Sequence, residues 1–312
     1  DYTLSRGLGD VYKRQVDSLA KLTGTNAYTI TIASGDAIGS TAAELNTINQ
    51  ATSLAVDASV VTSLALDELT NISELLMAVQ ATTQFTVDSF SLLEDVDVSD
   101  SSLIVTELND VIELANSLTG DTIITAFSLS SNATIFTGDE SAFIDLLSHE
   151  ENGQVTITAQ NLTVDSGTLS VGTANELDAT TTGTVTAEIA TDSTVVNLAT
   201  LTGTNAYTIT IASGDATGST ASELNAINEA TSLAVDASAV TGLALDEIIN
   251  INTLLTAGND TTQFTTDSFT LLGAVIVKDT LLSGSSLADA IDQSNNATGS
   301  TSTVFNIEAV ET

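Results

Sequence analysis

The densest group of side chains that could do chemistry is acidic. In the segment EDVDVSDSS, Glu94, Asp95, Asp97 and Asp100 lie within seven residues. Calcium takes about six to eight oxygen ligands, and such a cluster supplies about half of them, with water or a neighbouring segment adding the rest. The EF-hand pattern does not fit, because Asp100 stands where that loop needs glycine. We therefore expect Asp95, Asp97 and Asp100 as calcium ligands, and calcium is the one cofactor that the sequence suggests.

Hydroxyl groups form a second set, in runs such as YTITIA and QVTITA where polar and apolar residues alternate. Residues on a strand point to opposite faces in turn, so a buried Ile or Val face leaves Thr and Asp outside. The expected exposed set is Thr29, Thr31, Asp57, Thr156, Thr158, Thr208, Thr210 and Asp236. Two interpretations stay open for it: a solvated sheet face with good β-propensity, or a surface that binds cations or glycans through its oxygen atoms.

Motifs for catalysis are scarce. His149 is the single histidine and lies beside Glu150 and Glu151, as a solvated surface group would. The nucleophile elbow, the zinc motif HExxH and the phosphate-binding loop with its lysine are missing. Paired carboxylates can hydrolyse glycosides, but a chain with 41 acidic residues holds close pairs by chance. The sequence predicts that this protein is not an enzyme.

Short β-branched runs predict the strands that position these groups. The expected strands are 28–33, 53–57, 95–98, 122–126, 154–158, 184–189, 207–211, 232–236 and 274–277. Between them lie stretches of helical period with Thr-x-x-Glu capping boxes. The boxes begin at Thr41, Thr137, Thr173 and Thr220. Apolar stripes predict the buried faces of these helices, at Leu45 and Ile48, at Leu66, Leu69, Ile72 and Leu76, at Leu108, Val111, Ile112 and Ala115, and at Phe143, Ile144 and Leu147.

Strands that alternate with helices indicate parallel pairing with right-handed crossovers. Strands stack about 4.8 Å apart, whereas helices need about 8 to 10 Å, so the array must curve. We expect an α/β fold: a curved right-handed α/β solenoid of about nine coils, with helices outside and a parallel sheet inside. The alternative is a helix-free parallel β-solenoid.

The chain contains a long internal repeat. Residues 22–93 and 201–272 are two copies offset by 179 positions, with seven differences in the first 48. Repetition at a fixed period is typical of arrays in which each unit buries its apolar side against its neighbours. The expected organisation is one repeat array over 16–312, and neighbouring repeats of a longer chain are its expected partners.

The first fifteen residues, DYTLSRGLGDVYKRQ, differ from the rest. They hold Arg6, Lys13 and Arg14, while 16–312 keep only Lys21 and Lys278 as basic residues. This head resembles a translated sequencing-adapter read-through of the kind found in metagenomic proteins. We treat 1–15 as non-native, and the whole as a fragment.

Composition and charge restrict the function. A net charge of −36 repels nucleic acid and anionic lipid. Cysteine is absent, which excludes disulfides and thiol catalysis, and no apolar run is long enough to predict a membrane span. Because unscreened carboxylates repel one another, the chain suits a saline or calcium-rich exterior.

The phrases SGSTAAELNTINQATS and SLAVDASVVTSLA resemble the Ala/Thr-rich repeats of very large secreted or cell-surface proteins of marine cyanobacteria and other marine bacteria. The resemblance covers about residues 22–272 and implies an extracellular, non-enzymatic structural or adhesive segment that contacts glycans or cell-surface components. Two alternatives remain: a phage or viral fibre protein, which requires trimeric symmetry, and a Thr-rich glycan- or ice-binding module, which requires flat ranks of threonine.

Overall fold

The computed structural model describes residues 15–120, 123–130, 134–278, 282–299 and 303–308. This part of the chain divides into two compact units. The first unit takes residues up to 137 together with 141–157, and the second takes 138–140 together with 158 onward. Of the predicted elements, residue 122 lies outside the described residues, as do 1–14 of the head.

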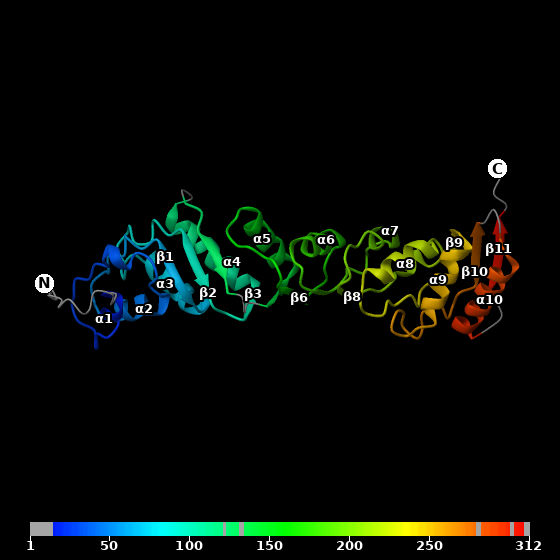
Figure 1. Cartoon of the computed structure of the whole chain (residues 1–312), viewed down its shortest axis with the longest axis horizontal. Helices are drawn as coiled ribbons and strands as arrows, with labels where there is room; N and C mark the ends of the chain where they lie inside the picture. Colours follow the sequence, from blue (N-terminus) through cyan, green and yellow to red (C-terminus); the bar gives the residue numbers. More distant parts are fainter. Residues whose placement is uncertain (1–14, 121–122, 131–133, 279–281, 300–302, 309–312) are drawn as a thin grey trace. The chain divides into compact units, whose positions relative to one another are not determined.

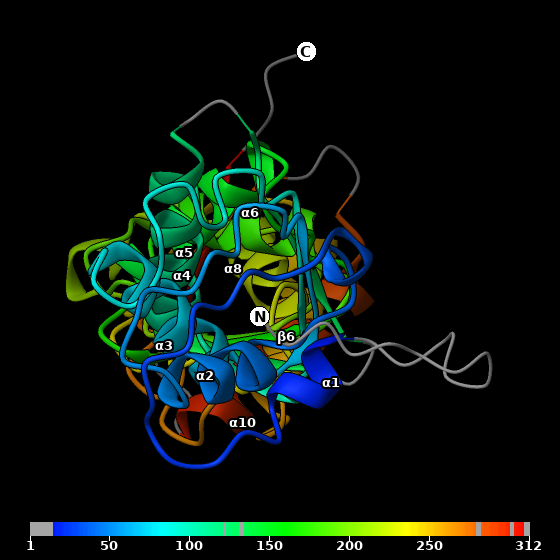
Figure 2. The same cartoon turned by 90° about the vertical axis from the view of Figure 1, so that its left-hand side faces the viewer.

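The first unit alternates helices and short strands in chain order (Figure 1). Its elements are α1 (Gln15–Leu19), the 3-10 helix η1 (Ser34–Asp36), α2 (Ala42–Gln50), β1 (Ser63–Asp67), α3 (Leu69–Gln80), β2 (Asp95–Val98), β3 (Ser102–Ile104), α4 (Val105–Thr119), β4 (Ala126–Leu129), β5 (Ile135–Asp139) and α5 (Glu140–Glu151), the last two reaching into 138–140. Helices α2, α3 and α4 pack side by side in sequence order (Figure 2).

The second unit repeats this alternation. Its elements are β6 (Asn161–Ser166), α6 (Val171–Thr180), β7 (Val185–Glu188), α7 (Val195–Leu198), β8 (Ala206–Thr208), η2 (Ser213–Asp215), α8 (Ala221–Glu229), β9 (Gly242–Asp246), α9 (Ile248–Gly258), β10 (Ala274–Lys278), α10 (Gly284–Thr298) and β11 (Val304–Glu308). Helix α9 packs between α8 and α10, and β10 pairs with both β9 and β11 (Figure 1).

All strand pairs between these elements are parallel in the described part of the chain. In the first unit β2 lies between β1 and β4, with Val96 opposite both Leu64 and Phe127, and β3 pairs with β5. In the second, β7 lies between β6 and β8. Each connection carries a helix, as parallel strands require. The α/β class is confirmed, and the helix-free alternative is wrong.

Helix starts follow the local sequence at two of the four expected capping boxes. The Thr41 hydroxyl accepts from the amide of Glu44, whose carboxylate accepts from the Thr41 amide, and Thr220 with Glu223 repeats this. The box at Thr137 is wrong, because Thr137 pairs within β5 opposite Ile104. The box at Thr173 is also wrong, because Ser170 caps α6 three residues earlier.

The strands expected at 95–98, 184–189 and 274–277 form as β2, β7 and β10. Residues 28–33, 53–57, 154–158 and 232–236 form only isolated parallel bridges, such as Thr31 to Asp57. The strand expected at 207–211 begins at Ala206 and ends at Thr208, and the one expected at 122–126 is instead β4 at 126–129. Strands β1, β3, β5, β6, β9 and β11 were not expected.

The core is built from aliphatic side chains with a few phenylalanines. Most residues expected to face inward are buried, but Leu54 and Leu66 are 43% and 54% exposed, and Leu147 is half-buried. Leu66 was assigned to a helical stripe, but it lies on β1, where the register with β2 shifts between Leu64 and Asp67, so Leu66 is exposed although Leu64 is buried. In the third stripe, Leu108, Val111, Ile112 and Ala115 are buried. Ile144 of the last stripe is exposed, whereas Phe143 is buried.

The two sequence copies contain the same elements. Adding 179 to the first residues of η1, α2, β1, α3 and β2 gives those of η2, α8, β9, α9 and β10. Phe90 and Phe269 share a backbone φ of 60°, which is unusual for a bulky residue. The equivalence also reaches α1 and α7, where Val16 and Val195 are both buried. The repeat therefore starts at about residue 16, six residues earlier than the sequence comparison placed it.

Candidate functional site

The predicted Thr/Asp face is exposed at its threonines and half-buried at its aspartates. Thr29, Thr31, Thr156, Thr158, Thr208 and Thr210 are exposed, while Asp57 and Asp236 are half-buried. Thr31 lies opposite Asp57 in a parallel bridge, and Thr210 lies opposite Asp236 in the other copy. One oxygen of each aspartate accepts from the amide two residues ahead, Ser59 at 3.1 Å and Ser238 at 2.9 Å. In both copies a threonine therefore lies opposite an aspartate, and each residue contributes side-chain oxygen to this face.

The acidic cluster is divided between two positions. Asp95 and Asp97 lie on β2, half-buried, and Asp95 accepts a hydrogen bond from Ser128 on β4 at 3.4 Å. Burial raises the pKa of Asp97, and the charge of Asp95 raises it further. Asp100 instead accepts from the amide of Leu69 at 2.7 Å, at the start of α3. Among the described residues no three His, Cys, Asp or Glu side chains come together as a group that could hold a metal ion, so the calcium site stays a prediction.

Carboxylates that cap a helix from another segment were missed by sequence reasoning. Asp67 accepts from the amide of Ala43 at 2.7 Å, in the first turn of α2, and Asp246 accepts from Ser222 at 2.6 Å in α8. Free amides at a helix N-terminus, together with the helix dipole, favour a negative charge there. Part of the acidity of this chain thus stabilises helices that lie about 24 to 31 residues away.

Glu140 belongs to the same group. Its Oε1 atom accepts from the Ser170 amide at 2.8 Å and from the Thr173 hydroxyl at 2.9 Å, at the start of α6. Burial alone raises the pKa of Glu140, but the hydrogen bonds from Ser170 and Thr173 outweigh it, so this pKa lies below its usual value. These caps could have been found by searching the sequence for an Asp or Glu about one coil away from each expected helix start.

Asparagine side chains join consecutive helices. In α2, α4, α8 and α9 the fifth helical residue is an asparagine whose amide donates to the carbonyl of the third residue of the next helix. These bonds run from Asn46 to Asn71, Asn109 to Ala142, Asn225 to Asn250 and Asn252 to Ser286, at 2.9 to 3.0 Å. The amides thus fix the spacing and register of neighbouring helices.

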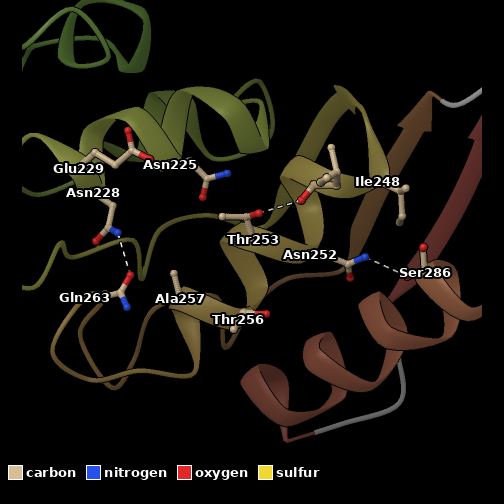
Figure 3. Close-up of a pocket in the computed structure, with 11 residues that line it drawn as sticks. Asn225, Asn228, Glu229, Ile248, Asn252, Thr253, Thr256, Ala257, Gln263 and Ser286 are labelled. Atoms are coloured by element: carbon tan, nitrogen blue, oxygen red, sulfur yellow. Dashed lines mark hydrogen bonds between the residues drawn. The ribbon is translucent and has the colours of Figure 1, made fainter.

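A polar groove of about 660 Å³ lies along α8, α9 and α10 (Figure 3). Asn228 donates to Gln263 at 3.0 Å across one end, and Asn252 donates to Ser286 at the other. The Oδ1 atom of Asn252 is buried without a partner in the described structure. Its asparagine NH2 groups donate to the Gln263 side chain or to backbone carbonyls, and the groove follows the seam between the helices.

His149 lies at the end of α5, where its Nδ1 atom is 2.6 Å from Gln154 Oε1. Its Nε2 atom is buried and has no partner in the described structure. The expectation of a solvated surface group is therefore wrong, because His149 is half-buried with its Nε2 atom inside the structure. Within the described residues no helix is both long and apolar enough to span a membrane.

The arrangement as a whole shows repeated structural contacts and an exposed Thr/Asp face. No family model matches the chain, and neither the curated proteins nor the solved structures compared with it include a significant match.

Proposed function

We propose that this chain is a non-enzymatic structural segment of a large extracellular or cell-surface protein, built as a curved right-handed α/β solenoid. The observation that carries the proposal is the recurrence, in both copies, of the bonds that join one coil to the next. Asp67 and Asp246 cap the preceding helix, and Asn46 and Asn225 reach the following one. Solenoids are built from units that each contact their neighbours in this repetitive way.

An extracellular position is supported by composition. The chain's net charge of −36 is tolerated best where salt or divalent cations screen it. Carboxylates that bond to helix amides need no basic partner, which accounts for how few basic residues the chain uses.

The experiment that tests the solenoid is a length measurement. A chain that carries one further copy of residues 16–194 between its own residues 194 and 195 is compared with the original by small-angle scattering. A solenoid lengthens by about 4.8 Å for each added coil at constant cross-section. A cross-section that grows while the length stays constant would refute the proposal. The mass in solution separates this monomeric array from a trimeric fibre.

A second candidate function is glycan or cation binding by the exposed face, since Thr31 lies opposite Asp57 and Thr210 opposite Asp236. Thr31→Val and Thr210→Val remove the hydroxyls and keep the β-branched shape. If this face binds neutral glycans, the double variant loses retention on a glycan array, whereas the helix variant Thr70→Val keeps it. Equal retention of the wild type, the double variant and Thr70→Val would contradict this candidate function.

A further inference from the structure

The two copies differ in burial where their sequences are identical. Residues 22–37 and 201–216 share every residue. Nevertheless Tyr28 is 38% exposed and Tyr207 is fully buried. Asn26 is exposed and Asn205 is buried in the same way. Because the local sequence is the same, the difference must come from what packs against each copy.

In the second copy the covering structure is the coil formed by α6 and β7. The Tyr207 hydroxyl donates to the carbonyl of Ala174 at 3.3 Å. Residues 186–188 of β7 pair in parallel with 206–208 of β8. Asn205 bonds twice to this coil: Oδ1 accepts from the Val185 amide at 2.9 Å, and Nδ2 donates to Asp178 at 2.8 Å. The surface of the second copy thus has a defined set of partners.

Within the described residues, the same surface of the first copy has no such cover. Residues 26–31 bridge to Thr52 and Asp57 on one side, and the described structure places no strand on the other. No hydrogen bond joins the side chain of Asn26 or Tyr28 to another described residue. An open strand edge with unpaired backbone groups is a template for a further strand.

We propose that the edge at residues 26–29 is a docking surface for another coil of the kind formed by residues 170–188, stacked before it in the array. The occupant supplies a parallel strand, a backbone N–H and a carboxylate for Asn26, and a helix carbonyl for Tyr28. This inference rests on the proposed array. The coil of α10 and β11 in a second molecule fits less well, because α10 has Ile291 at the eighth helical position, where α6 has Asp178.

Nitration of tyrosine tests this surface within the full chain. Residues 158–194, which contain no tyrosine, replace residues 1–15, so that Thr194 of the graft precedes Val16 as it precedes Val195. The reference is the full chain with Tyr2→Phe and Tyr12→Phe. In both proteins only Tyr28 and Tyr207 then remain, and peptide mass reports the nitration of each. We expect nitration of Tyr28 in the reference, its loss in the grafted chain, and protection of Tyr207 in both.

A matched control carries Ala174→Arg in the grafted segment alone, which blocks contact with the Tyr28 ring and should restore nitration there. Protection of Tyr207 shows in each sample that the chain is folded. Nitration of Tyr28 in the grafted chain, with Tyr207 protected, would overturn the proposal. Protection of Tyr28 in the reference at high concentration, together with a doubled mass, would also overturn it, because the occupant would then be a second molecule. Failure of the solenoid itself is read separately, in the scattering experiment.

Discussion

The carboxylate of Asp67 joins two helices, since its Oδ2 atom accepts from the amide of Ala43 at 2.7 Å in α2. Its Oδ1 atom accepts from the Glu68 amide and from the Asn71 side chain, both at 2.8 Å, at the start of α3. Asp246 makes the same three bonds in the second copy. One side chain therefore sets the position of one helix relative to the next, in addition to capping it.

Asp67→Ala should lower the free energy of unfolding by about 1 to 2 kcal/mol, because it removes the cap from two helix starts. Chemical denaturation of the variant measures the loss. Asp246→Ala should cost a similar amount, whereas Asp88→Ala, at an exposed position, should cost little. Equal stability of Asp67→Ala and Asp88→Ala would show that these bonds contribute nothing.

Leu45→Asp and Leu224→Asp should each destabilise their neighbourhood by several kcal/mol, because both leucines are fully buried and a buried charge without a partner is costly. Thermal melting followed by circular dichroism measures the effect. Leu66→Asp is the control, since Leu66 is 54% exposed. Unchanged melting of the Leu45 and Leu224 variants would contradict the assigned core.

Tyr207→Phe should cost about 0.5 to 1.5 kcal/mol, the contribution of one ordinary hydrogen bond, here to the Ala174 carbonyl. Tyr28→Phe should be neutral, which makes it a matched control. Burial raises the pKa of the Tyr207 phenol, and Asp178 raises it further. Its folded pKa lies above the unfolded one, so the contribution of Tyr207 is present at neutral pH and is lost as the pH rises past about 10. The melting temperatures of the wild type and of Tyr207→Phe should therefore converge at alkaline pH.

Glu140→Gln should destabilise the protein at neutral pH and have little effect in acid. The pKa of Glu140 is lower in the folded chain than its usual value, because the bonds from Ser170 and Thr173 outweigh burial. A lowered pKa contributes stability above the unfolded pKa, and this is lost as the pH falls through the folded pKa. Melting curves from pH 7 downward test this. A difference that stays constant with pH would mean that the charge of Glu140 is irrelevant.

Calcium at millimolar concentration should raise the melting temperature more than sodium of the same ionic strength, if Asp95 and Asp97 bind it. Asp95→Asn with Asp97→Asn should reduce this excess. Equal melting in calcium and sodium would exclude a specific site and leave general screening.

Asp97→Asn should also change the stability of the protein in the absence of calcium. The pKa of Asp97 is raised by burial and by Asp95, so its charged form is less stable in the folded chain. Folding is therefore favoured below the unfolded pKa, and that advantage is lost as the pH rises through the folded pKa. Asp97→Asn should raise the melting temperature at pH 7 but have no effect near pH 3, where Asp97 is protonated in both states.

The sequence predicted features that depend on near neighbours in the chain. The boxes at Thr41 and Thr220 and the strands β2, β7 and β10 could be inferred because their signals are contained within a few residues. The alternation of YTITIA predicted the burial of Ile30 and Ile32 even though no strand of regular length forms there.

Contacts between coils could not be inferred in the same way. Asp100 was assigned to calcium because its neighbours in sequence are acidic, but its partner is Leu69 in another segment. Thr137 and Thr173 matched the capping pattern, but strand pairing with Ile104 and the cap by Ser170 decide the structure there. Local sequence cannot rank these alternatives, because the distant partners, Leu69 for Asp100, Ile104 for Thr137 and Glu140 for Thr173, lie 31 to 33 positions away.

The bonds between coils also restrict how the gene can change in length. Loss of a single coil separates Asp67 from Ala43 or Asn46 from Asn71, and leaves an uncapped helix beside a carboxylate without a donor. Unequal recombination between the two copies inserts or deletes 179 codons and returns every coil to a neighbour of its usual kind. Length variants of this protein should therefore differ by whole periods.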